Sequence, residues 1–404
     1  MKGFEVNVHH LTRVEGHGNV VVNVKEGRIE ELRLEIVESP RFFEVMLRGR
    51  RWDEAAAITG RICGICSLGH TTASVLATEA ATGMVPDPEV VLLRKLLVDG
   101  ETIQSHILHT YFLVAPDVFG VGSVLPLAES HPDVVKRALR LKRLGNHMCD
   151  LLVGRKVHPV SYLPGGFTRW PETKDFACVR QLLLDARLDL EATVDLFSTV
   201  KLPDFKRETE FLALKSEGEY ALYTGDIASS LGQVSPPATY LDRIHEFVQP
   251  HSAAKHVRAQ KDAFAVGALA RFNVNHAALR PWAADVAKKL GLKAPDYNPF
   301  HNNLAQVVET VHCYEEALEL AEDLSKREYK HERRMPRKFG RGVGATEVPR
   351  GTLYHDYTYD ADGYITQANC IIPTGQNLAN IEKDMEALVP HVLDQSEEVR
   401  ATSM

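Results

Sequence analysis

The first forty residues alternate between apolar and polar positions, which is the pattern of β-strands with one buried face. Two β-rich runs in NVVVNVKEGRIEELRLEIVE, residues 19–38, flank the tripeptide Lys25-Glu26-Gly27, which suits a hairpin turn. The pattern predicts a small antiparallel sheet within residues 1–40.

From Asp53 onward, the apolar positions recur with the spacing of helices. The segments DEAAAITG and TTASVLATEAATGM are rich in alanine and other small residues, which permit close helix packing. Asp87 and Pro88 suit the N-cap and first turn of a long helix, which we expect to end at Pro116. We expect further helices over about residues 132–154, 174–200 with Thr173 as the cap, 252–290 and 302–328. The predicted helical core therefore spans residues 53–200 and 250–330.

Strand-like and turn-rich segments separate these helices. Residues 158–173 form a connector rich in proline and glycine, and EYALYTG suggests a second small sheet between about residues 200 and 245. The run GTLYHDYTYDADGYITQANCIIPTG is typical of strands, with a last helix near Gln376, so residues 345–404 are predicted to form a C-terminal β/α segment. The fold class predicted is mainly α with small β-sheets at the margins (α+β), as one large domain over residues 1–404.

Composition and charge exclude several functional classes. The chain has 404 residues, of which 44% are hydrophobic and 25% charged, and a net charge of -7, which argues against nucleic acid as a partner. The basic run KREYKHERRMPRKFGR, residues 326–341, is typical of a solvated helix end and loop. No apolar window reaches the length of a membrane span, and the charged N-terminus does not look like a signal peptide. Four of the six cysteines are isolated in the sequence, which fits a cytoplasmic protein without a disulfide framework.

The segment GRICGICSLGH, residues 60–70, carries the most specific chemistry, because it places Cys63 and Cys66 three residues apart and His70 four further on. A closed zinc site needs four ligands, and a thioredoxin-like pair needs a strand before it. Two inert buried thiols are the plain alternative, although the glycines at 60, 64 and 69 leave room beside the sulfurs. Half of a thiolate site for nickel, copper or an iron-sulfur cluster is the fourth interpretation, with the other ligands from elsewhere.

Six segments in order resemble the signature motifs of nickel-iron hydrogenase large subunits, in their cytoplasmic, multi-subunit branch. They are LTRVEGHG at 11–18, RFFEVMLRGR at 41–50, RICGICSLGH at 61–70, GRKVHPVSYLPGG at 154–166, EVPRGTLYH at 347–355 and IIPTGQNLAN at 371–380. The resemblance covers nearly the whole chain and implies the long-helix bundle core of that family.

The resemblance assigns a role to each matching residue. Cys63 corresponds to a terminal thiolate on nickel, Cys66 to a thiolate that bridges nickel and iron, and His70 to the histidine near the bridging sulfur. Glu15 corresponds to the glutamate that receives a proton, and Glu44 to a carboxylate on a magnesium ion. The residues matched to the surroundings of the metal pair are Asp117, Pro349, Arg350 and Thr374, of which Arg350 and Thr374 would donate to the cyanides on iron.

The same resemblance implies a reaction, cofactors and partners. The reaction is reversible heterolytic cleavage of dihydrogen at a nickel-iron centre that carries cyanide and carbon monoxide on iron. One CxxC cannot hold an iron-sulfur cluster, so such clusters belong to the partner subunit only. The expected partners are an iron-sulfur small subunit, further electron-transfer subunits and maturation proteins.

One family motif, DPCxxCxxH, does not occur in the 404 residues, so two of four nickel thiolates and a magnesium ligand are not among them. Three explanations are open: a C-terminal tail that was removed or not seen, an incompletely matured form, or a natural relative that has lost the metal. The last would be a structural subunit of an electron-transfer complex, and a zinc-binding module on Cys63, Cys66 and His70 is a further alternative. The enzyme is expected to be active only when the second cysteine pair is supplied.

Overall fold

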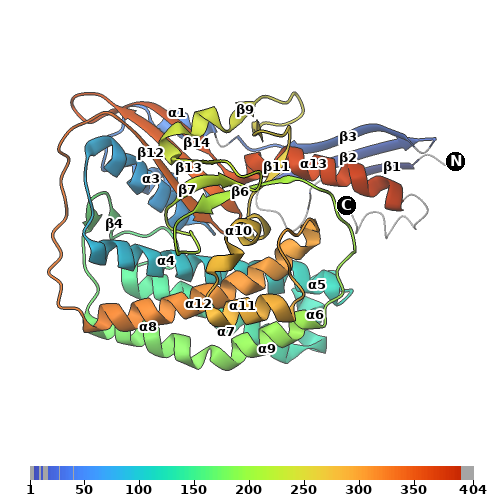
Figure 1. Cartoon of the computed structure of the whole chain (residues 1–404), viewed down its shortest axis with the longest axis horizontal. Coiled ribbons are helices and arrows are strands. Elements are labelled where there is room, and N and C mark those ends of the chain that lie inside the picture. Colours follow the sequence, from blue (N-terminus) through green and yellow to red (C-terminus); the bar gives the residue numbers. More distant parts are fainter. Residues whose placement is uncertain (1–3, 9–10, 12–16, 27, 40, 393–404) are drawn as a thin grey trace.

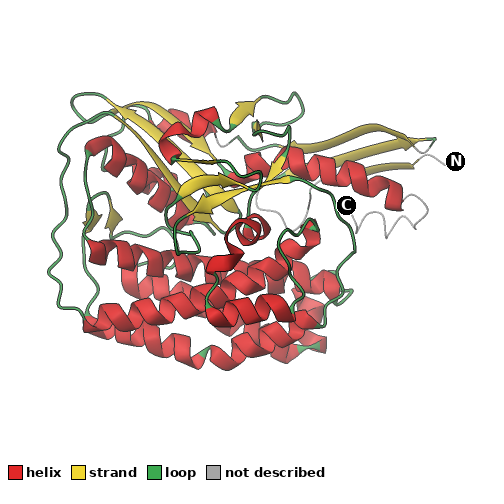
Figure 2. Ribbon diagram, viewed as in Figure 1, coloured by secondary structure: helices red, strands yellow, loops and turns green. Residues whose placement is uncertain are grey.

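The computed structural model describes residues 4–8, 11, 17–26, 28–39 and 41–392. A layer of long helices forms one side of the molecule, and small sheets with the remaining helices form the other (Figures 1 and 2). A three-stranded sheet and the last helix extend from one end. Within the described residues, no helix combines the length and the apolar composition that a membrane crossing needs.

The helical layer is built around α4 and α12, which pack against each other. Its members are α4 (Pro88–Ile107), α7 (Pro132–Val153), α8 (Thr173–Asp185), α9 (Arg187–Ser198), α11 (Pro281–Lys289) and α12 (Asn302–Lys326). Leu93 and Leu97 of α4 share one buried core with Val308 of α12 and Leu141 of α7. The helices predicted near 132–154 and 302–328 are confirmed.

Two predicted helix ends are wrong. Pro116 does not end the helix that begins at Pro88, because the π-helix η1 (Leu108–Val114) and α5 (Ala115–Val118) continue it. Proline is accepted in the first turn of α5, where its missing N–H would have had no partner within that short helix. Thr173 is the first residue of α8 and not its cap. Glu172 caps this helix instead, in a reciprocal capping box with Asp175.

The helix predicted over 252–290 is wrong in its first half. There the chain forms β10 (His256–Arg258) and β11 (Phe264–Ala265), and only then α10 (Ala268–Asn275), the 3-10 helix η3 (His276–Ala278) and α11. Pairing with β9 (His245–Phe247) and β6 (Glu210–Lys215) provides the backbone hydrogen bonds of β10 and β11. These strands are short and depend on their partners, so the local apolar spacing could not reveal them.

Similarly, the segment EYALYTG is a buried connection and not a strand. Tyr220 and Tyr223 within it pack into the helical core. The strands of this region are β6, β7 (Asp226–Ser229) and β8 (Val234–Ser235), which form the sheet β11-β6-β7-β8.

The N-terminal sheet has the predicted antiparallel hairpin. It consists of β1 (Phe4–Val8), β2 (Gly18–Lys25) and β3 (Arg28–Ile36) in the order β1-β2-β3. Val20, Val22 and Leu34 from this sheet pack with Leu378 and Met385 of α13 (Pro373–Val392), the helix expected near Gln376. This last helix therefore holds the N-terminal sheet to the rest of the chain.

The C-terminal sheet, β12-β13-β14, lies against α3 (Ser67–Thr82). Its strands are β12 (Arg341–Val348), β13 (Gly351–Tyr359) and β14 (Ile365–Ile371), as the sequence predicted for residues 351–371. The remaining short elements are α1 (Arg41–Leu47), α2 (Ala55–Thr59), α6 (Val124–Ser130), β4 (Tyr162–Leu163), β5 (Gly166–Phe167), η2 (Pro237–Asp242) and η4 (Pro299–His301).

The backbone of β12 touches that of α3, and glycine makes this approach possible. A Cβ atom at Gly344 would overlap the carbonyl oxygen of Ala73, and one at Gly342 would overlap the backbone of Ala81. At the other end of the contact, a Cβ at Gly69 would overlap the side chain of Val348. Side chains on either element would therefore push the strand and its following turn away from α3.

We expect the substitution Gly344→Ala to lower the free energy of unfolding by about 1–3 kcal/mol, because the new methyl group meets backbone that cannot move aside. Gly340→Ala is the matched control, since its Cβ would lie 3.8 Å from the oxygen of Ala81, an ordinary contact. Denaturant unfolding of the two variants measures the difference. An equal stability of both would contradict the account of the close packing.

Candidate functional site

Cys63 and Cys66 lie in the turn between α2 and α3, and Cys66 directly precedes α3. The two residues are joined by a disulfide, with their Cα atoms 5.5 Å apart. Both are buried, with 7% and 4% of their surface exposed, and the N–H of Cys66 donates to Sγ of Cys63 over 3.1 Å. Because α2 and not a strand comes before the pair, the thioredoxin-like arrangement is not formed.

The guanidinium of Arg350 faces both sulfurs. Its Nη2 donates to Sγ of Cys63 and to Sγ of Cys66, each over 3.1 Å. A fixed cation at this distance stabilises negative charge on sulfur, so the reduced pair would be favoured as thiolates. Thiolates, and not thiols, are the form that binds metals.

Apolar side chains surround the two sulfurs. Ala73, Val348 and Leu353 form a buried cluster with the cysteine pair, and the half-buried Ile65 and Ile372 pack against it. Ile65 belongs to the CxxC turn and Ala73 to α3, Val348 ends β12, Leu353 lies near the start of β13, and Ile372 directly precedes α13. The tertiary structure thus brings the β12–β13 hairpin and the residue before α13 to the CxxC from far along the chain, and apolar side chains exclude water from much of the site.

Arg350 owes its position to a two-residue hairpin turn. Pro349 and Arg350 connect β12 to β13, where Val348 pairs with Gly351. Gly351 has φ +138, and a Cβ there would overlap Val266. Only glycine fits this position, so the turn geometry that presents Arg350 depends on it.

The buried Arg271 of α10 forms hydrogen bonds with the backbone of the same turn. Its Nη1 donates to the carbonyl of Val348 over 2.9 Å, and its Nη2 donates to the carbonyl of Pro349 over 3.0 Å. The guanidinium also pairs with Glu309 of α12 and Glu347 of β12, at 2.7 and 2.9 Å, and all three side chains are fully buried. The guanidinium of Arg271 therefore links the carboxylates of Glu309 and Glu347 to the two carbonyls that precede Arg350.

His70 is buried on α3. Burial, together with the charge of Arg350, lowers the pKa of His70 to about 3, so its imidazole is neutral at neutral pH. Its Nδ1 lies 3.3 Å from Nε2 of His355, whose Nδ1 in turn lies 2.6 Å from the hydroxyl of Tyr357. Within the described residues, Cys63, Cys66 and His70 do not form a group of converging metal ligands, which disfavours the zinc module.

The other residues singled out by the sequence lie in different surroundings. Pro349 is buried in the turn, Asp117 is exposed on α5, and Thr374 is exposed in the first turn of α13. Glu15 lies outside the described residues. The roles expected for these four residues, and for His70, therefore stay predictions.

Glu44 is half-buried on α1. Its Oε1 accepts the N–H of Cys370 over 3.1 Å and lies 4.0 Å from Nζ of Lys255. Burial raises the pKa of this carboxyl, and the Cys370 amide and Lys255 oppose the rise. An oxygen ligand is available here, and its role toward magnesium stays a prediction.

Sequence reasoning missed several buried ionisable groups, among them Arg271, Glu309 and Glu101. Glu101 of α4 accepts the N–H groups of Leu68 and Gly69 over 2.8 and 2.9 Å, and its burial raises its pKa to about 8. Together with Ile65 and Cys149 it lines a small pocket at the start of α3. The available signal was a charged residue inside an otherwise apolar helical segment, which requires a partner in the fold.

None of the remaining cysteines lies in the cluster around the pair. Cys149 and Cys313 belong to the helical core and Cys370 to the core beneath the C-terminal sheet, while Cys178 is exposed on α8. The described part of the chain thus provides two sulfurs at this site and no others.

Comparisons with known proteins agree with one another. The sequence profile described as nickel-dependent hydrogenase matches residues 41–133, which include the CxxC. The chain is 36% identical to the alpha chain of sulfhydrogenase 1 of Pyrococcus furiosus, over 98% of this chain and 93% of that protein. It is 32% identical to a subunit of the F420-non-reducing hydrogenase vhu of Methanococcus voltae, over 95% of this chain and 97% of that protein.

The fold is similar to solved hydrogenase structures. An NAD+-reducing [NiFe]-hydrogenase in the H2-reduced state aligns with a TM-score of 0.85 and 26% identity, over 97% of this chain and 94% of that one. The Ni-Fe-Se hydrogenase from D. vulgaris Hildenborough aligns with a TM-score of 0.76 and 25% identity, over 93% and 90% of the two chains. The α+β fold expected from the sequence is confirmed by these likenesses.

We expect Arg271→Lys to destabilise the chain by roughly 3–5 kcal/mol, because lysine cannot serve two carboxylates and two carbonyls at once and leaves buried charge unpaired. Arg140→Lys is the control, since Arg140 pairs with Asp189 at the surface, where the exchange should change stability by less than about 1 kcal/mol. Denaturant unfolding gives both values. If the two variants lost the same stability, Arg271 would not hold the turn.

Proposed function

We infer the function from the family: the chain belongs to the nickel-dependent hydrogenases and is the large subunit of a nickel-iron hydrogenase. It cleaves dihydrogen reversibly into protons and electrons, and the electrons pass to an iron-sulfur small subunit. The structural observation that supports this function most directly is the position of the Arg350 guanidinium. It lies 3.1 Å from the sulfurs of both Cys63 and Cys66, among apolar side chains.

We propose that Cys63 and Cys66, once reduced, are the two ligands that this chain contributes to the nickel-iron centre. Their fit is supported by soft sulfur donors, burial and a cation that stabilises thiolate charge. When bound, the centre would supply a Lewis acid that polarises dihydrogen. Two thiolates do not complete a nickel site of four, so we propose that a second cysteine pair of the type DPCxxCxxH completes it.

Arg350 is proposed to bind and orient anionic groups at the iron side of the centre. Its planar fork can donate to a cyanide while its charge stabilises the thiolates. Pro349 and Thr374 are proposed to lie beside the same ligands, cyanide and carbon monoxide, and Asp117 near Arg350. Rigidity of the two-residue turn supports this role, because Arg271 binds the carbonyls of Val348 and Pro349, the two residues that precede Arg350.

Proton movement is proposed to begin at the cysteine pair and to continue through Glu15, toward the outside. A carboxyl group can accept a proton and release it again if its pKa lies near the working pH. His70 is proposed to act as a neutral hydrogen-bonding partner near Cys66, which agrees with the lowered pKa of its buried ring. Glu44 is proposed to contribute an oxygen to a magnesium ion, which prefers such ligands.

Electrons require a partner, because a single CxxC cannot hold an iron-sulfur cluster. The two relatives from Pyrococcus furiosus and Methanococcus voltae are themselves single subunits of larger hydrogenases, which implies a small subunit beside this chain. We propose further that electron-transfer subunits and maturation proteins act with it, and that the complex is cytoplasmic.

The purified complex is expected to contain nickel bound through Cys63 and Cys66. Cys63→Ser and Cys66→Ser should each lower nickel content at least ~10-fold and abolish dihydrogen-dependent dye reduction, because an alcohol is a poor ligand for nickel at neutral pH. Cys178→Ser, an exposed cysteine on α8, is the matched control and should keep both.

Elemental analysis of the same preparations also tests the alternative. Equal amounts of nickel and iron at the large subunit, in addition to small-subunit iron, support the enzyme. A complex without nickel in the unaltered protein would show a structural subunit instead.

The substitution Arg350→Lys tests whether the site needs only a positive charge at this position or also the planar shape of the guanidinium. Lysine keeps the cation but loses the planar fork, so we expect dihydrogen oxidation to fall by roughly 10²–10³-fold with nickel content retained. Arg341→Lys, at the far end of β12 and paired with Asp356, should keep the rate within about twofold. A full rate in Arg350→Lys would remove the guanidinium from the proposed site.

A further inference from the structure

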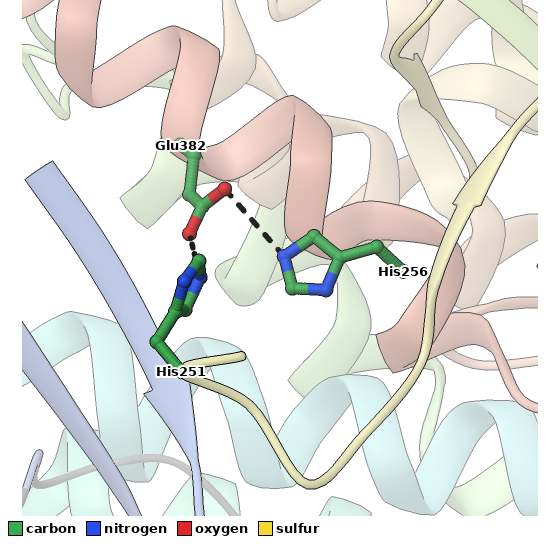
Figure 3. A group of neighbouring side chains, drawn as sticks. All are labelled: His251, His256 and Glu382. Atoms are coloured by element: carbon green, nitrogen blue, oxygen red, sulfur yellow. Dashed lines mark hydrogen bonds and ion pairs between the residues drawn. The ribbon is translucent and has the colours of Figure 1, made fainter. Parts of the chain in front are cut away.

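A second group of metal-binding side chains lies at the junction of three elements. His251 follows β9, His256 is the first residue of β10, and Glu382 lies on α13 (Figure 3). One ligand atom from each lies within 4.8 Å of the other two, and the described residues contain no other such group of three.

The separations of these atoms suit a single metal ion. Nε2 of His251 lies 3.0 Å from Oε1 of Glu382, and Nε2 of His256 lies 3.5 Å from Oε2 of the same carboxylate. Ligands bound to zinc at about 2.0–2.2 Å in a tetrahedron lie about 3.3–3.5 Å apart. Only small side-chain movements would therefore be needed to place all three on one ion.

His256 gives an independent indication that a ligand belongs here. Its side chain is completely buried, and neither ring nitrogen has a hydrogen-bond partner, although Nε2 faces Glu382. Buried polar atoms of native proteins nearly always have a partner. A metal ion between His256, His251 and Glu382 would supply a partner for Nε2, the ring nitrogen that faces Glu382.

The carboxylate is held in place by the backbone, as metal ligands commonly are. The N–H of Leu34 in β3 donates to Oε1 of Glu382 over 3.0 Å. The nearby cation Lys255 pairs with Glu246 at 2.7 Å and lies 4.0 Å from Glu44, so its charge is directed at other carboxylates. The negative charge of Glu382 is thus directed at the two histidines.

We propose that His251, His256 and Glu382 bind one zinc ion. Two imidazole nitrogens and one carboxylate oxygen suit zinc, whereas magnesium prefers a shell of oxygens alone. The side chains of His251 and Glu382 remain 17% and 16% exposed, which leaves access for a water molecule as the fourth ligand.

The ion would act as a clasp on the N-terminal sheet. Glu382 lies on the helix that carries Leu378 and Met385, and the apolar contact of that helix with β2 and β3 also includes Ala254, between the two histidines. A bound ion would join the loop before β10 directly to α13, and through Leu34 to β3. Metal binding and folding of this corner would then be coupled.

The test uses the full chain in its purified complex, stripped with a chelator and then titrated with Zn²⁺ alone. We expect zinc bound with nitrogen and oxygen neighbours at about 2.0–2.1 Å in X-ray absorption spectra. His251→Gln and Glu382→Gln should each weaken this binding at least ~10-fold. His245→Gln, an exposed histidine on the neighbouring β9, is the matched control and should bind as the unaltered protein does.

The outcomes separate this site from the cysteine pair. Zinc with sulfur neighbours at about 2.3 Å would place the ion on Cys63 and Cys66 and overturn the proposal, as would no binding or equal binding by all variants. His251 is only half-buried, so its variant should fold even if the Glu382 variant does not. A zinc-dependent rise in melting temperature that is lost in His251→Gln and kept in His245→Gln would support the clasp.

Discussion

The buried guanidinium of Arg271 is the constraint on which the arrangement of the site depends. It carries five N–H donors, and the hydrogen bonds to Glu309, Glu347, Val348 and Pro349 use the whole fork. Burial disfavours charge on Glu309, but the adjacent Arg271 and His106 outweigh it and hold the pKa of Glu309 well below its usual range. Such a buried network contributes little net stability, yet removing one member leaves unpaired charge. This makes the position of the turn at 349–350 nearly fixed.

The close contact of α3 with β12 supplies the second half of that geometry. Gly342 and Gly344 let the strand meet the helix at backbone distance, Gly69 leaves room for the side chain of Val348, and α3 begins directly after Cys66. The cysteine pair and the turn that carries Arg350 therefore lie at the same end of the contact between α3 and β12. Arg271 fixes the turn, and the glycines fix the distance between strand and helix. The guanidinium of Arg350 therefore reaches both sulfurs, although Arg350 lies almost three hundred residues further along the chain.

Helix α13 connects the two proposed metal sites. Ile372, just before its start, packs against the cysteine cluster, and Glu382 lies further along it, among the residues that hold the N-terminal sheet. The cysteine site is apolar and offers sulfur and a cation, which suits soft metals and negative charge. The histidine site offers two nitrogens and a carboxylate, which suits zinc. The two donor sets would thus select different metals within one chain.

The sequence by itself determined the element types where the pattern was local: the hairpin at 19–36, the helices at 132–153 and 302–326, and the strands at 351–371. The ordered motifs also identified the family and the cysteine pair, because motif residues are recognisable without their neighbours. The first half of 252–290 was predicted as helix because its strands depend on partners outside it, and Pro116 was predicted as a helix end because the π-helical turn before it has no sequence signal. Only the tertiary structure decided that Arg350 faces both sulfurs, that Arg271 holds its turn, and that His251, His256 and Glu382 meet. Each of these depends on contacts between segments far apart in the chain, and hydrophobic periodicity carries no information about which distant polar groups will become partners.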